Sequence, residues 1–216
     1  MKLVDLSLQQ FIMQVASSSP APGGGSIAAL QGACGVALTN MALELTISKK
    51  KFQSLEPTLQ DQIRAIHSSL QSLIQDFVTC IDEDTEAFNL IMKAFSLPKT
   101  SEAEKQARKQ AILAGTYEAI AIPKKVIATA LEAFTKFDIV FPYLNQNTLS
   151  DQGVAILCLA TAIEGAAYNV LINLPSLPDE NEKALLKDEA YQAILKANQH
   201  RSQHFETILD GLFQAS

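Results

Sequence analysis

The sequence is poor in the residues that build disulfide frameworks, metal centres and tight turns. Its 216 residues include three cysteines, three histidines, nine glycines and no tryptophan. The cysteines are Cys34, Cys80 and Cys158, an odd number, widely spaced and each in an apolar stretch. This pattern predicts buried, reduced thiols in a cytoplasmic protein, and it excludes a disulfide scaffold or a paired-cysteine zinc site.

A long basic tract is also missing. Seventeen lysines and arginines stand against 23 acidic residues, which gives a net charge of -6. Binding to nucleic acid or to an anionic membrane needs a basic face, so we expect neither partner. No charge occurs from Leu6 to Leu43, which imitates a membrane span, but glycines and polar side chains interrupt this stretch. We interpret it as a helix central to a bundle.

Strand patterns are nearly absent, whereas apolar residues recur at spacings of three and four along most of the chain. The pattern predicts an all-α protein whose longest helix runs from Pro57 for nearly forty residues. Ser101 is expected to open a helix with a kink or joint at Pro123, and Ser150 to cap another. We predict one domain over residues 1–216, a bundle of long antiparallel helices that pairs through apolar faces as a homodimer.

Glycine is concentrated in one short segment. Five of the nine glycines lie within thirteen residues: Gly23, Gly24, Gly25, Gly32 and Gly35. Glycines before a helix allow backbone N–H groups to approach a carboxylate or phosphate closely, and they equally permit tight helix crossing. We predict a ligand-facing loop at Gly23–Gly25, and helix packing at Gly32 and Gly35.

Asp84 occupies a position where the apolar stripe of its helix calls for an apolar residue, midway between Cys80 and Phe88. A charge there is costly unless it is paired or has a function, so both a catalytic role and a polar helix edge remain open. Asp151 has a simple structural explanation, since an aspartate in the first turn of a helix is stabilised by the helix dipole.

Two further sets of residues allow a structural or a functional interpretation. Asn169 and Asn173 share one face of an apolar helix, where buried amides satisfy either backbone or a ligand. Lys49, Lys50 and Lys51 follow a helix, where they suit its dipole or an anionic ligand. His200 and His204 have metal-ligand spacing but no evident third ligand, so we predict a solvated helix face and no metal.

Several motifs together resemble the formiminotetrahydrofolate cyclodeaminase / methenyltetrahydrofolate cyclohydrolase family. They are S-P-A-P-G-G-G-S-I-A-A-L from Ser19, T-I-S-K-K-K-F from Thr46, D-T-E-A-F from Asp84, L-P-K from Leu97, S-D at Ser150, and N-V-L-I-N-L from Asn169. They occur in order over most of the chain. One departure is Ser48, where the resemblance leads us to expect glycine.

The resemblance implies an all-helical fold, a folate site near a subunit interface and one-carbon chemistry without a metal or redox cofactor. In bifunctional relatives this domain follows a formiminotransferase domain. The 216 residues of this sequence leave no room for one, so we expect a stand-alone version. Both family reactions need proton transfer at one carbon, for which Asp84 is our candidate and Asp151 a helper. An alternative is a non-catalytic folate-binding or helical scaffold protein that keeps the fold.

The resemblance also implies roles for the other motif residues. The glycine segment would hold the pterin or a carboxylate, with Pro22 and Ser26 at its ends. The lysines Lys49–Lys51 would meet the glutamyl tail of a folate with one or more glutamates, and Asn169 and Asn173 would hydrogen-bond the pterin.

Overall fold

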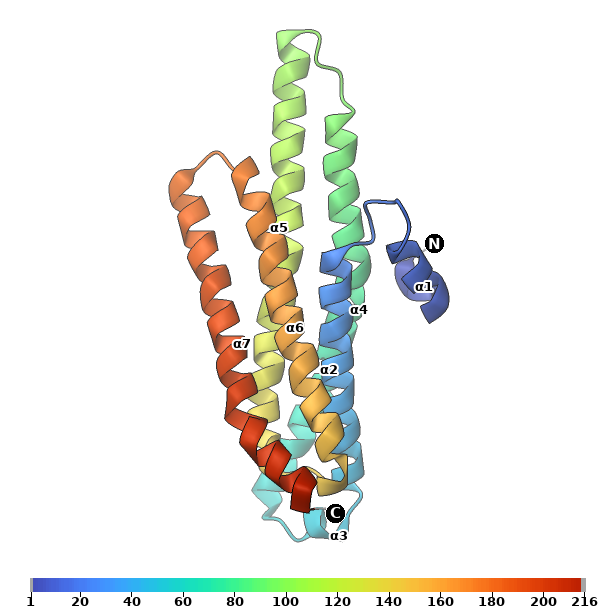
Figure 1. Cartoon of the computed structure of the whole chain (residues 1–216), viewed down its shortest axis with the longest axis vertical. Coiled ribbons are helices and arrows are strands. Elements are labelled where there is room, and N and C mark those ends of the chain that lie inside the picture. Colours follow the sequence, from blue (N-terminus) through green and yellow to red (C-terminus); the bar gives the residue numbers. More distant parts are fainter. Residues whose placement is uncertain (1, 215–216) are drawn as a thin grey trace.

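The helical prediction is confirmed by a computed structural model that describes residues 2–214 (Figure 1). No strand occurs within that range. The helices are α1 Leu8–Val15, α2 Gly24–Ile47, α3 Lys50–Gln53, α4 Pro57–Phe95, α5 Glu102–Val140, α6 Leu149–Asn173 and α7 Glu180–Gln214. Short 3-10 turns cover Leu3–Asp5, Phe141–Tyr143, Gln146–Thr148 and Leu174–Ser176.

Local sequence signals start most of these helices. Ser7 caps α1 and Ser101 caps α5, each in a capping box with the residue three positions later. Pro57 opens α4, where its missing N–H has no intrahelical partner to lose. The predicted cap at Ser150 is wrong, because a 3-10 turn runs directly into α6 and Thr148 precedes its first residue.

Of the predicted kink or joint at Pro123, the joint is wrong, because α5 runs unbroken from Glu102 to Val140 with this proline buried inside it. The kink stays a prediction. A proline in a helix interior removes one backbone hydrogen bond. The helix packs along α4 on one side and α6 on another. Tertiary packing therefore keeps the segment helical where local preference favours a break.

Helices α2 and α6 lie side by side, with α4 next to α2, α7 next to α6, and α5 packed behind them against α4 and α6 (Figure 1). Gly32 and Gly35 serve this packing, as predicted. A Cβ at Gly32 would lie 2.3 Å from the Phe77 ring, and one at Gly35 would lie 2.9 Å from the Ala155 carbonyl oxygen. The absence of these two side chains therefore lets α4 and α6 approach α2 closely.

The α4–α5 hairpin extends well beyond the N-terminus of α2 (Figure 1). Helix α2 begins beside Asp84, and α4 continues from there to Phe95. Eleven further residues at the helical rise correspond to about 16 Å. The α4–α5 hairpin therefore extends past the first turn of α2, and the candidate site lies where α2 begins beside α4.

Several large apolar side chains of α2 and α6 are exposed, and the surface that carries them is here called the α2/α6 face. Its exposed members are Met41, Leu45, Val154, Leu157, Tyr168 and Ile172. The same two helices are long and apolar enough to cross a membrane. About half of the most apolar stretch of each, 56% in α2 and 50% in α6, is buried inside the bundle. Cys34 is exposed and Cys158 half-buried, so the prediction of buried thiols holds only for Cys80.

Candidate functional site

The N-terminus of α2 is capped by a carboxylate from another helix. Gly23, its N-cap residue, has no side chain to accept a hydrogen bond from the first turn. Asp84 of α4 takes this role, because its Oδ2 accepts a 3.0 Å hydrogen bond from the Ser26 hydroxyl and its carboxylate also accepts from the Ser26 backbone N–H. A negative charge is stabilised at this position by unpaired N–H groups and the helix dipole.

Gly25 makes this contact sterically possible. A Cβ at Gly25 would lie 2.0 Å from Asp84 Oδ1 and 2.5 Å from its Cγ. The loop predicted for Gly23–Gly25 is wrong in form, because Gly24 and Gly25 belong to the first turn of α2. The expected close approach to the glycine backbone does occur at Gly25, and the group that approaches it is the Asp84 carboxylate.

Burial raises the pKa of Asp84 above its ordinary value, while the two hydrogen bonds from Ser26 act in the opposite direction. Ser26 itself is fully buried, and its hydroxyl also lies 2.9 Å from the Ile81 carbonyl oxygen and 3.3 Å from Thr85 Oγ1. The Ser26 hydroxyl has one proton for the Asp84 carboxylate and the Ile81 carbonyl oxygen, and it can donate to or accept from the Thr85 hydroxyl. The carboxyl group is therefore held beside the first turn of α2, with a pKa that burial raises above its ordinary value.

Asn169 of α6 lies beside the same helix terminus, and Asn173 follows it one turn later on α6. A Cβ at Gly24 would lie 3.3 Å from Asn169 Nδ2. Asn169 Nδ2 donates to the Gly165 carbonyl and Asn173 Nδ2 to the Asn169 carbonyl, each at 2.8 Å. These bonds fix the amides to their own helix and leave the amide oxygens as acceptors for a ligand. Pro22, which was also among the predicted binding residues, is buried directly before Gly23 at the start of α2.

The remaining predicted residues lie at the other end of the bundle. Lys49, Lys50 and Lys51 form the start of α3 and are exposed, and Asp151 is half-buried in the first turn of α6. Lys49 is 23 residues from Ser26, which corresponds to about 34 Å along a helical path. Within one chain, these residues and Asp84 are not brought together.

Lys49 and Lys51 instead line a separate pocket of about 220 Å³, together with Phe52, Tyr143 and Asn145 among others. Thr46 ties this end of α2 to the turn before α6, because the Asn145 N–H donates to Thr46 Oγ1 at 2.8 Å. The two ends of α2 therefore each carry a set of motif residues.

The histidines contradict the prediction of a solvated face. Asp138 of α5 lies between two histidines of α7, with its Oδ1 2.6 Å from His204 Nε2 and its Oδ2 2.9 Å from His200 Nδ1. His204 is only 5% exposed and contacts Phe137 and Phe141. These residues join α5 to α7. No group of three or more metal-type side chains suited to an ion occurs among residues 2–214.

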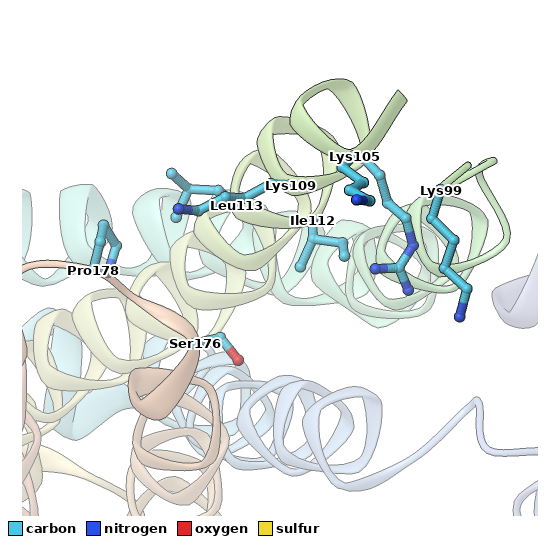
Figure 2. Close-up of a pocket in the computed structure, with 8 residues that line it drawn as sticks. Lys99, Lys105, Lys109, Ile112, Leu113, Ser176 and Pro178 are labelled. Atoms are coloured by element: carbon cyan, nitrogen blue, oxygen red, sulfur yellow. The ribbon is translucent and has the colours of Figure 1, made fainter. Parts of the chain in front are cut away.

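Sequence reasoning missed a basic cleft at the tip of the α4–α5 hairpin. This tip cleft, about 750 Å³ in volume, faces the turn between α6 and α7 (Figure 2). Its lining consists of Lys99, Lys105, Arg108, Lys109, Ile112, Leu113, Ser176 and Pro178. The cations are spread over the eleven positions from Lys99 to Lys109. Apart from Lys99, which belongs to the L-P-K motif, only their shared cleft singles them out.

Comparison with known proteins gives consistent similarities. Residues 7–192 match the family described as formiminotransferase-cyclodeaminase. A methenyltetrahydrofolate cyclohydrolase from Methylorubrum extorquens is 35% identical over 80% of this chain and 81% of its own length. The formimidoyltransferase-cyclodeaminase of Mus musculus is 31% identical over 97% of this chain, which spans 37% of that protein. A crystal structure of formiminotetrahydrofolate cyclodeaminase from Thermotoga maritima has a TM-score of 0.78 and 25% identity, covering 95% of this chain and 98% of that one.

Proposed function

Because the chain belongs to the formiminotransferase-cyclodeaminase family, we propose that it is an enzyme of folate one-carbon chemistry. Its reaction is the cyclisation of 5-formiminotetrahydrofolate to 5,10-methenyltetrahydrofolate, the hydrolysis of 5,10-methenyltetrahydrofolate to 10-formyltetrahydrofolate, or both. The single observation that carries this proposal is the hydrogen-bonded Asp84 carboxyl group at the N-terminus of α2.

In the cyclisation, N10 attacks the formimino carbon, the carbon–nitrogen bond to the formimino nitrogen breaks, and ammonia leaves. When the formimino group is protonated, as =NH2+, N10 loses one proton and the departing nitrogen gains one, so that ammonia leaves with its three hydrogens. A single carboxyl group beside that carbon can accept the first proton and donate the second. Asp84 suits both tasks, because burial raises its pKa and so makes its protonated form accessible at higher pH.

In the hydrolysis, water attacks the methenyl carbon, the bond from that carbon to N5 breaks, and N5 takes up a proton. The attacking water loses protons during the same sequence. Asp84 in its ionised form would accept the first of these, and its charge would stabilise the cationic centre before the attack. Neither reaction changes the oxidation state of the substrate, so we propose that no redox cofactor takes part. We propose that Asp84 supplies the proton transfers without a metal.

The residues around Asp84 have separate roles in this proposal. Ser26 positions the carboxyl group, since it donates from both its hydroxyl and its backbone N–H. Asn169 and Asn173 offer amide oxygens to the donor groups of the pterin from the neighbouring helix. The pterin would lie over the start of α2, under the overhanging hairpin.

We further propose that two copies pair through the α2/α6 face in antiparallel orientation. Large apolar side chains are exposed along this face, Ile172 at 75% and Leu157 at 54%. Exposed large apolar side chains on two neighbouring helices favour an interaction surface. A two-fold axis near the middle of α2 would place the Asp84 end of one copy beside the Lys49–Lys51 end of the other.

This arrangement gives the distant motif residues a function. Asp151 from the second copy would approach the reaction centre as a helper, and Lys49–Lys51 would meet the first glutamyl carboxylates of the folate. Support for it comes from the two sets of motif residues at opposite ends of α2, with the α2/α6 face between them.

The test supplies each substrate separately and follows the absorbance of the methenyl group. Its appearance from 5-formiminotetrahydrofolate demonstrates the cyclisation, and its disappearance faster than the blank demonstrates the hydrolysis. In Asp84→Asn we expect turnover to fall by about two to four powers of ten with folding intact. No change with either substrate in the unmodified protein would instead favour the folate-binding scaffold.

A further inference from the structure

The two cysteines outside the core lie close together on the α2/α6 face. Cys34 of α2 is exposed and Cys158 of α6 is half-buried. A Cβ at Gly35, the residue after Cys34, would lie 3.2 Å from Cys158 Cβ. Burial raises the pKa of the Cys158 thiol, and the negative charge of a nearby Cys34 thiolate raises it further. The two residues are far apart in the sequence, so only the packing of α2 against α6 makes them neighbours.

Three contacts give the register of the antiparallel helices α2 and α6. In each of them a glycine of one helix lies against a residue of the other: Gly24 with Asn169, Gly165 with Ala28, and Gly35 with Cys158. Each step forward along α2 therefore corresponds to one step back along α6. Asp151 lies seven positions before Cys158, so it is level with Ala42, seven positions after Gly35.

The proposed pairing of two copies then fixes the level of the two-fold axis. It places Asp151 of the second copy beside Asp84, and Asp84 is level with Gly25. The axis must pass midway between the levels of Gly25 and Ala42, which is within one residue of Cys34. A two-fold axis that crosses the helices within the interface sets each helix antiparallel to its own copy, so a residue at the axis faces itself. The pairing therefore brings Cys34 against Cys34 of the second copy.

The dimensions of a helix pair allow a disulfide at this point. Packed helix axes lie about 8–10 Å apart, and each Cα lies about 2.3 Å from its axis. Facing Cα atoms on helices about 10 Å apart are therefore about 5 Å from each other, within the roughly 4.4–6.8 Å that disulfides span. Cys34, Ala37 and Met41 are all exposed and follow one another at helical spacing, so the Cys34 thiol lies on the outward stripe of α2.

Resting on the pairing in the proposed function, we propose that the Cys34 and Cys158 thiols cluster at the two-fold axis, where oxidation joins the copies by a disulfide between their Cys34 side chains. Cys158 is level with Gly35 and so lies beside the same axis. Cys34 forms the bond because it is the exposed thiol of the two. Two protonated thiols and a disulfide are all uncharged, so the product suits an apolar interface.

The oxidant in this proposal is a small-molecule disulfide such as oxidised glutathione. The Cys34 thiolate of a free chain attacks it, which forms a mixed disulfide and releases one small thiol. When a second copy docks, its Cys34 thiolate attacks the Cys34 sulfur of the mixed disulfide. The bond between the copies forms and the second small thiol leaves. The two chains thereby lose two protons and two electrons, and the small disulfide gains them.

The experiment incubates the full chain with oxidised glutathione at about pH 8.5, near the ordinary pKa of a thiol, and follows the covalent dimer on a non-reducing denaturing gel. We expect this dimer in the unmodified protein and in Cys158→Ser, and none in Cys34→Ser. The matched control is Cys80→Ala, which removes the buried thiol and should still form the dimer. A covalent dimer that persists in Cys34→Ser, or that is absent from the unmodified protein, would overturn the inference.

A variant of the face tests whether pairing precedes the bond. In Leu157→Glu the covalent dimer should form about tenfold more slowly, because only pairing gives the two thiols an effective concentration far above that of free chains. An equal rate in this variant would mean that the bond forms by random collision, and it would overturn the inference.

Sedimentation velocity in a reducing buffer and the turnover assay separate this inference from the proposed function. A reduced protein that sediments as a dimer but does not cross-link overturns only the disulfide. A reduced protein that stays monomeric removes the pairing and the disulfide together. Loss of turnover with cross-linking intact overturns only the proposed reaction. If all three hold, dilution should lower turnover per chain in the reduced protein and not in the cross-linked one, because the bond keeps Asp84 beside Asp151 of the second copy.

Discussion

Replacing Gly25 by alanine tests the link between the N-terminus of α2 and Asp84 most directly. The new Cβ would lie 2.0 Å from Asp84 Oδ1, whereas real Cβ contacts do not fall below 3.0 Å. The carboxyl group must therefore retreat by about 1 Å or rotate away, and a displacement of that size can lower turnover about 100-fold.

The stability of the same variant should change little. Alanine inside a helix gains about 0.5–1 kcal/mol over glycine. Loss of one or two hydrogen bonds between Ser26 and Asp84 costs about 1–2 kcal/mol. The net destabilisation is then about 1 kcal/mol, small beside the expected loss of activity.

The assay measures kcat by methenyl absorbance and the free energy of unfolding by urea titration at one protein concentration. Gly153→Ala is the matched control, because it is also a glycine inside a helix and its Cβ would meet Ile208 at an ordinary 3.4 Å. A Gly25→Ala protein that keeps near-normal kcat would refute the assignment of Asp84 to the reaction.

Three further predictions follow from the described contacts. Ser26→Ala removes a hydrogen bond that lowers the pKa of Asp84, so that pKa rises further and the acid limb of the pH profile of kcat/KM moves to higher pH. His204→Ala removes the 2.6 Å contact to Asp138 and leaves a cavity, which should lower the free energy of unfolding by about 2–4 kcal/mol in urea titrations. Leu157→Glu places a charge on the α2/α6 face and should convert a dimer to monomers in sedimentation velocity.

Each of these has a result that contradicts it. An acid limb that stays in place in Ser26→Ala would mean that Asp84 does not control it. An unfolding free energy within 0.5 kcal/mol of the unmodified value would show that His204 contributes no more than an ordinary surface residue. For the α2/α6 face, Leu185→Glu on the exposed side of α7 is the control, and equal behaviour of both variants would argue against the dimer.

The helices were predictable because their signals are local. The three-and-four spacing through Ile63, Ile66 and Leu70 follows directly from the helical period, and these side chains are buried in α4. The capping box at Ser101 likewise depends on residues within one turn. Pro123 misled the prediction, because α5 is held by its neighbours across the position where local preference favours a break.

The candidate site was only half visible in the sequence. Asp84 could be singled out, because a charge on an apolar stripe violates a local rule. Its partner Ser26 is 58 positions away, and nothing in either segment specifies the other. The motif order pointed to a family, and the match over residues 7–192 confirms it.

The sequence by itself determined the helices of this protein, the apolar faces they present and the family to which the chain belongs. Only the tertiary structure decided which helix end meets which side chain. It joined Asp138 to His204, placed Asp84 at the start of α2, and brought Ser176 opposite the cations of the hairpin. Helical periodicity acts over one or two turns, whereas these contacts depend on how closely whole helices pack, and therefore on small residues such as Gly25 at their crossings.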